Sequence, residues 1–192
     1  MKKNRKGQAK VISTPGLDKV TTSIPSMLHR AVVITLRNTG ARISEVVQLR
    51  WEDLDKSEIQ FPKEITKNKL DTRSIPISKD YFNLMNTKWK SEWARIKGRK
   101  PSEKDYIFPG RFADSHISSR AVMYVLTDAF ERAEITGATS HSFRRTQLSK
   151  LHKSGVPLKV IQSLSGHRNL GTLQRYLEVD DADKRAAVTL LA

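Results

Sequence analysis

Residues 141–176 read HSFRRTQLSKLHKSGVPLKVIQSLSGHRNLGTLQRY, and no other stretch of the sequence is as informative. Its pattern predicts three successive helices. The first runs from His141 to Lys153 and is ended by Gly155, the second is opened by Pro157 and runs to Leu164, and the third lies around Leu170 to Leu177. Two imidazoles, a guanidinium and a phenol are thereby carried on one short helical part of the chain.

The chemistry of this stretch suits a phosphate group. His141 and Arg144 are three residues apart, so on a helix they share a face and can converge on one group. The guanidinium of an arginine matches two phosphate oxygens and keeps its charge at neutral pH, whereas a histidine can exchange a proton there. His167 and Tyr176 add a second imidazole and a potential nucleophile downstream.

A second arginine stands at the entrance to a short predicted helix, in Thr39-Gly40-Ala41-Arg42-Ile43-Ser44-Glu45. Arg42 and Glu45 are three residues apart, and we expect the Glu45 carboxylate to fix the position of the Arg42 guanidinium without contacting the phosphate itself. The alternative is a plain surface ion pair, which contributes little to stability.

Outside these motifs the pattern predicts further helices and one hairpin, hence an α+β fold that is mainly α-helical with a small antiparallel β-sheet. The expected elements are a helix from Ser26 to Arg37 that stops at Gly40, a short helix from about Ile43 to Leu49, edge strands at Ile59–Phe61 and Ser74–Ile77, a long helix with Phe82, Met85, Trp89, Trp93 and Ile96 on its buried face, and a helix capped by Ser118 or Ser119 that runs to about Ala133.

The composition favours a polyanionic partner. Lys and Arg number 35 against 20 Asp and Glu among the 192 residues, a formal net charge of +15, and such an excess favours binding to phosphates with release of counterions. The alternative is a basic surface that serves solubility alone. No apolar segment resembles a membrane span or a signal peptide, so we expect a cytoplasmic protein associated with the nucleoid.

The sequence predicts neither a cofactor nor a metal. It contains no cysteine, which excludes disulfides and zinc fingers. A metal-dependent nuclease needs converging carboxylates to hold Mg²⁺. The acidic residues near the motifs form no such cluster; they are Glu131, Glu134, Glu178 and Asp180.

The motifs, taken in order, resemble the tyrosine recombinase family, the lambda-integrase-like enzymes. The resemblance extends from about Leu17 to Val179. The first catalytic arginine of the family looks like Arg42, its His-x-x-Arg box resembles His141–Arg144, and its Leu-x-Gly-His box resembles Leu164–His167. The family's nucleophile then falls on Tyr176, nine residues after the box histidine. The resemblance implies the catalytic-domain fold of that family.

The resemblance also implies a mechanism. Tyr176 attacks the scissile phosphorus to form a 3′-phosphotyrosyl link, and the free 5′ hydroxyl of a partner strand later reverses the step. Arg42 and Arg144 bind the non-bridging oxygens and stabilise the growing charge. His141 accepts the phenol proton, and His167 donates a hydrogen bond to the phosphate.

A lysine on a β-hairpin completes the family's site. The segment Thr66-Lys67-Asn68-Lys69 resembles it, with Lys67 in the better-matching position to protonate the leaving oxygen and Lys69 as a rival. For each of the two lysines the alternative is an ordinary solvated charge at a turn.

Four basic residues are further candidates for contacts with the DNA backbone, and one glutamate supports the site from behind. The contacts are Lys69, Arg120, Arg145 and Lys159, with a structural contact as the alternative for Arg145; the supporting residue is Glu45. The remaining histidines, His29, His116 and His152, are assigned no role.

Three segments are expected along the chain: a basic N-terminal arm or linker at residues 1–16, the catalytic domain at 17–179, and a tail at 180–192. By resemblance the tail packs on a neighbouring protomer in a homotetramer on double-stranded DNA, the free protein being a monomer or weak oligomer; packing onto its own domain is the alternative. Family members generally carry an N-terminal domain that clamps DNA. The chain is therefore either a catalytic fragment or a naturally short member, with modest, salt-dependent affinity.

Two other functions share many of these features. A regulator of recombinase descent would bind DNA without cutting it, and the presence of all five residues Arg42, His141, Arg144, His167 and Tyr176 argues against it. A type IB topoisomerase would use the same phosphotyrosine chemistry to relax a duplex. The sequence favours recombination, by integration, excision or inversion.

Overall fold

The structure is a computed structural model that describes residues 9–66, 71–174, 185, 188 and 189. Within these ranges it is mainly helical and holds one two-stranded sheet, as the sequence predicted. The elements are α1 (Thr14–Thr22), α2 (Met27–Thr39), α3 (Ile43–Val46), the 3₁₀ helix η2 (Trp51–Asp53), β1 (Glu58–Phe61), β2 (Arg73–Pro76), α4 (Lys79–Leu84), the π-helix η3 (Met85–Trp89), α5 (Lys90–Lys97), α6 (Ser119–Arg132), α7 (Ser140–Lys153), α8 (Leu158–Ser165) and α9 (Leu170–Gln174).

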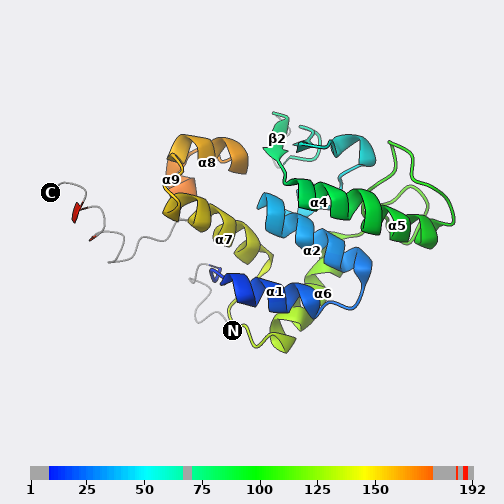
Figure 1. Cartoon of the computed structure of the whole chain (residues 1–192), viewed down its shortest axis with the longest axis horizontal. Helices are drawn as coiled ribbons and strands as arrows, with labels where there is room; N and C mark the ends of the chain where they lie inside the picture. The colour runs from blue at the N-terminus through cyan, green and yellow to red at the C-terminus, as the bar shows by residue number, and fades with distance from the viewer. Residues whose placement is uncertain (1–8, 67–70, 175–184, 186–187, 190–192) are drawn as a thin grey trace.

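Helix α2 lies at the centre of the molecule and packs against α1, α6, α7 and the middle of the α4–α5 run (Figure 1). Its apolar residues Val32, Val33 and Leu36 are fully buried, which is why the main core forms around it. A second, smaller cluster of Leu148, Ile161 and Leu173 ties α7, α8 and α9 together. Helix α8 in turn contacts β2, so the hairpin and the last helices meet at one end of the molecule.

Capping residues set the ends of several helices where the sequence predicted them. Ser26 caps α2, Ser118 caps α6, and Gly40 ends α2 in the left-handed conformation with a φ of 60°. Gly166 ends α8 in the same way, with a φ of 65°. Helix α9 is described as far as Gln174, so the expected continuation to Leu177 lies outside the described residues.

Strands β1 and β2 pair antiparallel, with Ile59 opposite Ile75 and Phe61 opposite Arg73. Because side chains alternate between the two faces of a strand, Arg73 shares the core-facing side of β2 with Ile75. Its guanidinium lies 4.9 Å from the centre of the Phe61 ring. The hairpin therefore carries a positive charge on its buried face.

The long helix was predicted correctly in position, but two residues of its predicted buried face, Phe82 and Ile96, lie outside the core, and Tyr81 is buried in place of Phe82. Elements α4, η3 and α5 form one continuous helical run from Lys79 to Lys97. Its fully buried residues, Met85, Trp89 and Trp93, follow one another at intervals of four because a π-helical turn lies in the middle. Ile96 falls off this face and is 45% exposed.

The first helix begins earlier than expected. The sequence pattern predicted that the first helix begins at Ser26, but α1 already spans Thr14–Thr22. The last residues of the expected arm at 1–16 are therefore helical. The helix was missed because its buried side is short and mixed, with only Leu17, Val20 and Thr21. Just before it, Ile12 is buried and its backbone N–H donates to the Thr146 hydroxyl at 2.9 Å. This segment is therefore fastened to α7.

No helix in the described ranges is long and apolar enough to cross a membrane.

We expect Thr146→Val to lower the free energy of unfolding by about 1–3 kcal/mol, because it leaves the buried Ile12 N–H without its acceptor. Urea denaturation followed by circular dichroism measures the change. Thr127→Val is the matched control: its exposed hydroxyl bonds only to its own helix, so the effect should stay within about 0.5 kcal/mol. Equal effects of the two substitutions would contradict the role given to Thr146.

Candidate functional site

Arg144 is the most deeply buried arginine of the site. It lies on the first turns of α7 and is 2% exposed. Nη1 donates to the Gly40 carbonyl oxygen at 2.9 Å, and Nη2 donates to the Ser165 carbonyl oxygen. Nη2 also lies 3.4 Å from Nδ1 of His167. Carbonyl oxygens orient a guanidinium without cancelling its charge.

Arg42 is the N-cap residue of α3 and is bound on two sides by Glu45. The Arg42 backbone N–H donates to Glu45 Oε2 at 3.1 Å, and Arg42 Nη1 donates to Oε1 at 2.8 Å. Glu45 is fully buried. The pair expected from the sequence spacing is therefore present, and it is not an ordinary surface ion pair.

A third arginine, Arg73 on β2, was missed by the sequence analysis. Its Nη2 donates to Glu45 Oε2 at 2.9 Å, and its Nη1 lies 3.4 Å from the Ser165 carbonyl oxygen. The signal that could have identified it is the alternation of Arg73-Ser74-Ile75-Pro76, which places the arginine on the same face as the apolar Ile75.

The two arginines control the charge of Glu45. Burial by itself raises the pKa of the carboxyl, but the charge and hydrogen bond of Arg73, with the hydrogen bonds of Arg42, outweigh it. The net result is a pKa below the usual range for Glu45. The side chain therefore stays ionised at neutral pH and can hold both guanidinium groups.

His167 is held neutral by its surroundings. It is buried beside Ser165, whose hydroxyl lies 2.8 Å from Nδ1. Burial, then the charges of Arg144, Arg42 and Arg73, lower its pKa to about 3. Because a guanidinium can only donate, the Arg144 contact makes Nδ1 an acceptor and leaves the ring proton on Nε2. A neutral His167 can thus donate one hydrogen bond to an anion.

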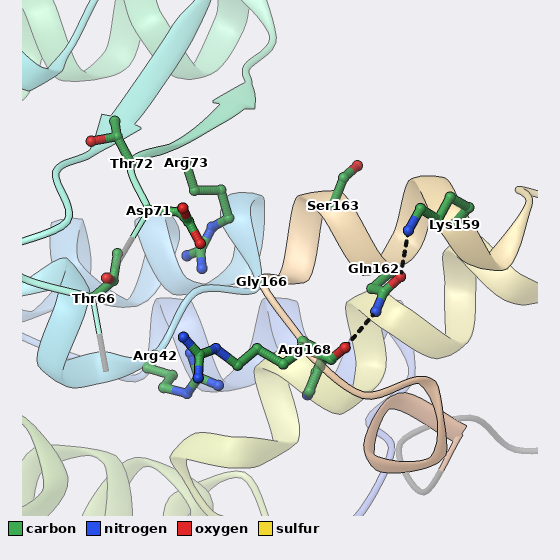
Figure 2. A pocket seen from close by; sticks show the side chains of 11 residues that line it. Arg42, Thr66, Asp71, Thr72, Arg73, Lys159, Gln162, Ser163, Gly166 and Arg168 are labelled. Atoms are coloured by element: carbon green, nitrogen blue, oxygen red, sulfur yellow. Dashed lines mark hydrogen bonds between the residues drawn. The ribbon is translucent and has the colours of Figure 1, made fainter. Parts of the chain in front are cut away.

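A cavity of about 350 Å³ opens beside these residues (Figure 2). It lies between the hairpin, the start of α3, and α8 with the turn that follows it. Figure 2 shows Arg42 and Arg168 extending into this opening, with Lys159 on α8 at its edge. Its lining is Arg42, Thr66, Asp71, Thr72, Arg73, Lys159, Gln162, Ser163, Gly166, His167 and Arg168. With several cations against Asp71, the cavity suits an anionic group.

His141 meets Arg42 and Arg144 at a second, smaller cavity of about 110 Å³. His141 itself is exposed at the start of α7. Arg42 lines both cavities, so it joins the His141 side of the site to the His167 side.

The structure brings together Arg42, Glu45, His141, Arg144 and His167, all of which the sequence analysis had selected. Tyr176, Lys67 and Lys69 lie outside the described residues. The described residues on either side of 67–70, Thr66 and Asp71, both line the larger cavity.

The three other candidates for DNA contact have different positions. Lys159 lines the larger cavity. Arg120 is exposed at the start of α6, where it contacts the Tyr124 hydroxyl, and it lines neither cavity of the site. Arg145 is buried, and its Nη1 donates to the Ala9 carbonyl oxygen at 2.6 Å. This contact supports the structural role that the sequence left open as the alternative for Arg145, since it holds the N-terminal segment.

In the described part of the chain, no three His, Asp or Glu side chains are grouped so that they could hold a metal ion.

The sequence model described as the phage integrase family matches residues 17–183. The tyrosine recombinase XerC of Staphylococcus saprophyticus is 31% identical over 157 residues, which cover 81% of this chain and 51% of the relative. A tyrosine recombinase of Thermosipho africanus is 30% identical over 170 residues, covering 85% of this chain and 54% of the relative. The chain spans about half the length of these curated relatives.

Solved structures share the fold. The catalytic domain of bacteriophage HP1 integrase superposes with a TM-score of 0.66 at 19% identity, covering 88% of this chain and 87% of that one. XerA recombinase gives a TM-score of 0.73 at 19% identity over 99% of this chain and 66% of that one. The XerH site-specific recombinase, bound to a palindromic difH substrate after cleavage, gives 0.76 at 19% identity over 98% and 55%. The predicted fold class is confirmed.

The low pKa of His167 predicts how stability depends on pH. Between its ordinary value of about 6.5 and its folded value of about 3, the unfolded chain binds a proton that the folded chain does not. The free energy of unfolding should therefore fall as the pH is lowered below about 6.5.

His167→Gln should reduce this fall, because glutamine does not titrate. Urea denaturation at a series of pH values between about 7 and about 5 tests this prediction. This range lies above the ordinary pKa values of carboxyl groups, so their titration contributes little. If the wild type and the variant lose the same free energy over this window, His167 is not kept neutral by its surroundings.

Proposed function

The chain belongs to the phage integrase family, and we propose from this membership that it breaks and rejoins double-stranded DNA as a site-specific tyrosine recombinase. The observation that carries the proposal is that Arg42 lines the larger cavity with His167 and the smaller one with Arg144, whose Nη2 lies 3.4 Å from Nδ1 of His167. Three donors directed at one anion are what the transfer of a phosphodiester requires.

The phosphate occupies the space between the guanidinium groups of Arg42 and Arg144. Both side chains are already oriented by protein acceptors, so little rearrangement is needed when charge grows on the non-bridging oxygens. His167 adds a hydrogen bond from Nε2. His141, on the other side of Arg42, accepts the phenol proton of Tyr176.

In the chemical step, the phenolic oxygen of Tyr176 forms a bond to phosphorus as the bond from phosphorus to the 5′ oxygen breaks. The proton of the phenol passes to His141, and Lys67 gives a proton to the leaving oxygen. Lys67 is preferred over Lys69 because it stands in the better-matching position of the family's motif; the described residues on either side of both lysines, Thr66 and Asp71, line the cavity. Rejoining reverses the step with another 5′ hydroxyl, so no external energy source is needed.

We further propose that the protein assembles as a homotetramer on its DNA and acts at the nucleoid. The excess positive charge supports binding to the DNA backbone, and Lys159 lines the cavity as one contact. Residues 1–8 would serve as a basic arm, because residues 9–16 belong to the segment bonded to α7 and to α1, and residues 180–192 would be the segment exchanged between protomers. Among solved structures that share the fold, the Tn1549 transposon integrase was determined in complex with transposon right-end DNA.

A covalent adduct tests the proposal. A pool of short randomised duplexes, each nicked so that the short fragment released with a free 5′ hydroxyl diffuses away, is incubated with the chain at low salt, and adducts are isolated under denaturing conditions. We expect the wild type to enrich a defined sequence in the adduct and Tyr176→Phe to form none, because phenylalanine has no oxygen to attack phosphorus. An adduct that persists in Tyr176→Phe would sink the assignment, and supercoil relaxation without recombinant products would favour a topoisomerase.

Sulfur in place of the leaving 5′ oxygen distinguishes Lys67 from Lys69, because a thiolate leaves without being protonated. On the natural ester, Lys67→Ala should slow adduct formation by about a hundred- to ten thousand-fold. On the sulfur-containing duplex its rate should return to near that of the wild type.

Lys69→Ala is the matched control and should respond equally to both substrates. The opposite pattern would assign the acid to Lys69, and no rescue in either variant would remove the general acid from this segment.

A further inference from the structure

We propose that Arg73 is a positioning residue that aligns the hairpin with the two phosphate-binding arginines, acting through Glu45 and Ser165. This inference rests on the proposed function, because it concerns the same phosphate site. It assigns a task to a side chain that the sequence motifs do not include.

The first observation is that the fold holds Arg73 in a place where an arginine is costly. It occupies a core-facing position of a strand, is buried, and lies over the Phe61 ring. A charged group in such a place persists only when it is well paired. Its partners therefore explain why it is there.

Those partners are the Glu45 carboxylate and the Ser165 carbonyl, which also bind the other two arginines. Glu45 Oε2 accepts from Arg73 Nη2, while Oε1 of the same carboxylate accepts from Arg42. The Ser165 carbonyl oxygen accepts from Arg144 and also lies 3.4 Å from Arg73 Nη1. The planar guanidinium of Arg73 thus contacts both Glu45, which binds Arg42, and the Ser165 carbonyl, which binds Arg144.

Arg73 also lies very close to Gly166, in the turn that follows α8. A Cβ atom at Gly166 would lie 2.5 Å from Arg73 Nη1, closer than any real contact allows. Gly166 also has a positive φ of 65°, so glycine is favoured there on two separate grounds. The turn that carries His167 can therefore pack against Arg73 because residue 166 has no side chain.

The position of Arg73 in the chain makes it a link to the hairpin. It is the first residue of β2 and follows directly after Asp71 and Thr72, which line the cavity, and it comes six residues after Lys67. A displacement of Arg73 would thus move the base of the hairpin relative to Arg42 and Arg144. Since reactive groups must be aligned to a fraction of an ångström, such a displacement slows the chemical step.

Arg73 acts through these neighbours rather than on the phosphate itself. Both of its terminal nitrogens have protein acceptors, and little of its side chain is accessible. Its removal should consequently affect the rate of cleavage at saturating protein more than the affinity for DNA.

The experiment measures three quantities on Arg73→Gln and Arg73→Lys: the thermal midpoint, the affinity for a duplex enriched by the wild-type adduct, and the single-turnover rate of adduct formation at saturating protein. We expect affinity within about threefold of the wild type and a rate lowered by about tenfold to a hundredfold in both variants. Lysine fails because a single ammonium group cannot reach both acceptors as the planar fork does. Arg95→Gln, on the exposed side of α5, is the matched control and should leave all three quantities unchanged.

A double-substitution cycle tests whether Arg73 acts through Glu45. In a Glu45→Gln background, Arg73→Gln should lower the rate by a smaller factor than in the wild type, because the shared support is already weakened. Equal factors in the two backgrounds would overturn action through Glu45.

The outcomes separate this inference from the proposed function. If the wild type forms no adduct with any duplex of the pool, the proposed function fails. If it forms adducts and Arg73→Gln or Arg73→Lys cleaves as fast, the function stands and the positioning role is overturned. A rate restored fully by lysine, or a loss confined to affinity, also overturns it. Should Arg73→Gln not fold, Arg73→Lys, which keeps the buried charge, carries the comparison.

Discussion

Two helix C-termini meet at one guanidinium, and the site depends on this contact. The carbonyl oxygens of Gly40, at the end of α2, and Ser165, at the end of α8, both accept from Arg144. The last carbonyls of a helix lack partners within it and carry partial negative charge, so a buried arginine between two such ends is stabilised from both sides. Helix α7 is thereby held against α2 and α8, and His167, just after α8, is held beside Arg144.

The same arrangement explains the electrostatic character of the site. Glu45 compensates part of the charge of Arg42 and Arg73, while the carbonyl partners of Arg144 orient its charge without removing it. The remaining positive charge lowers the pKa of His167 and leaves the ring neutral. Donors that are fixed, charged and partly shielded from water stabilise a phosphate in its transition state more strongly than mobile surface lysines would.

Much of the fold could be predicted because its signals are local. Ser26, Ser118 and Gly40 act on the chain within one helical turn, and each begins or ends a helix as expected. The errors arose where distant packing decides. Helix α1 has a weak apolar face and is held by α2 and α6, and the π-helical turn that displaces Ile96 leaves no mark in the sequence pattern.

The site divides in the same way. The sequence by itself determined the chemistry, through the types and spacing of Arg42, Glu45, His141, Arg144 and His167. Local rules place the first four on helices or at a helix start, and His167 lies in the turn that follows α8. Only the tertiary structure decided that Arg73 joins them and that Arg145 turns inward to the Ala9 carbonyl. The physical reason is the range of the contacts. Ser165 and Ala9 lie 92 and 136 residues from the arginines they accept from, and such partners become neighbours only when the core packs.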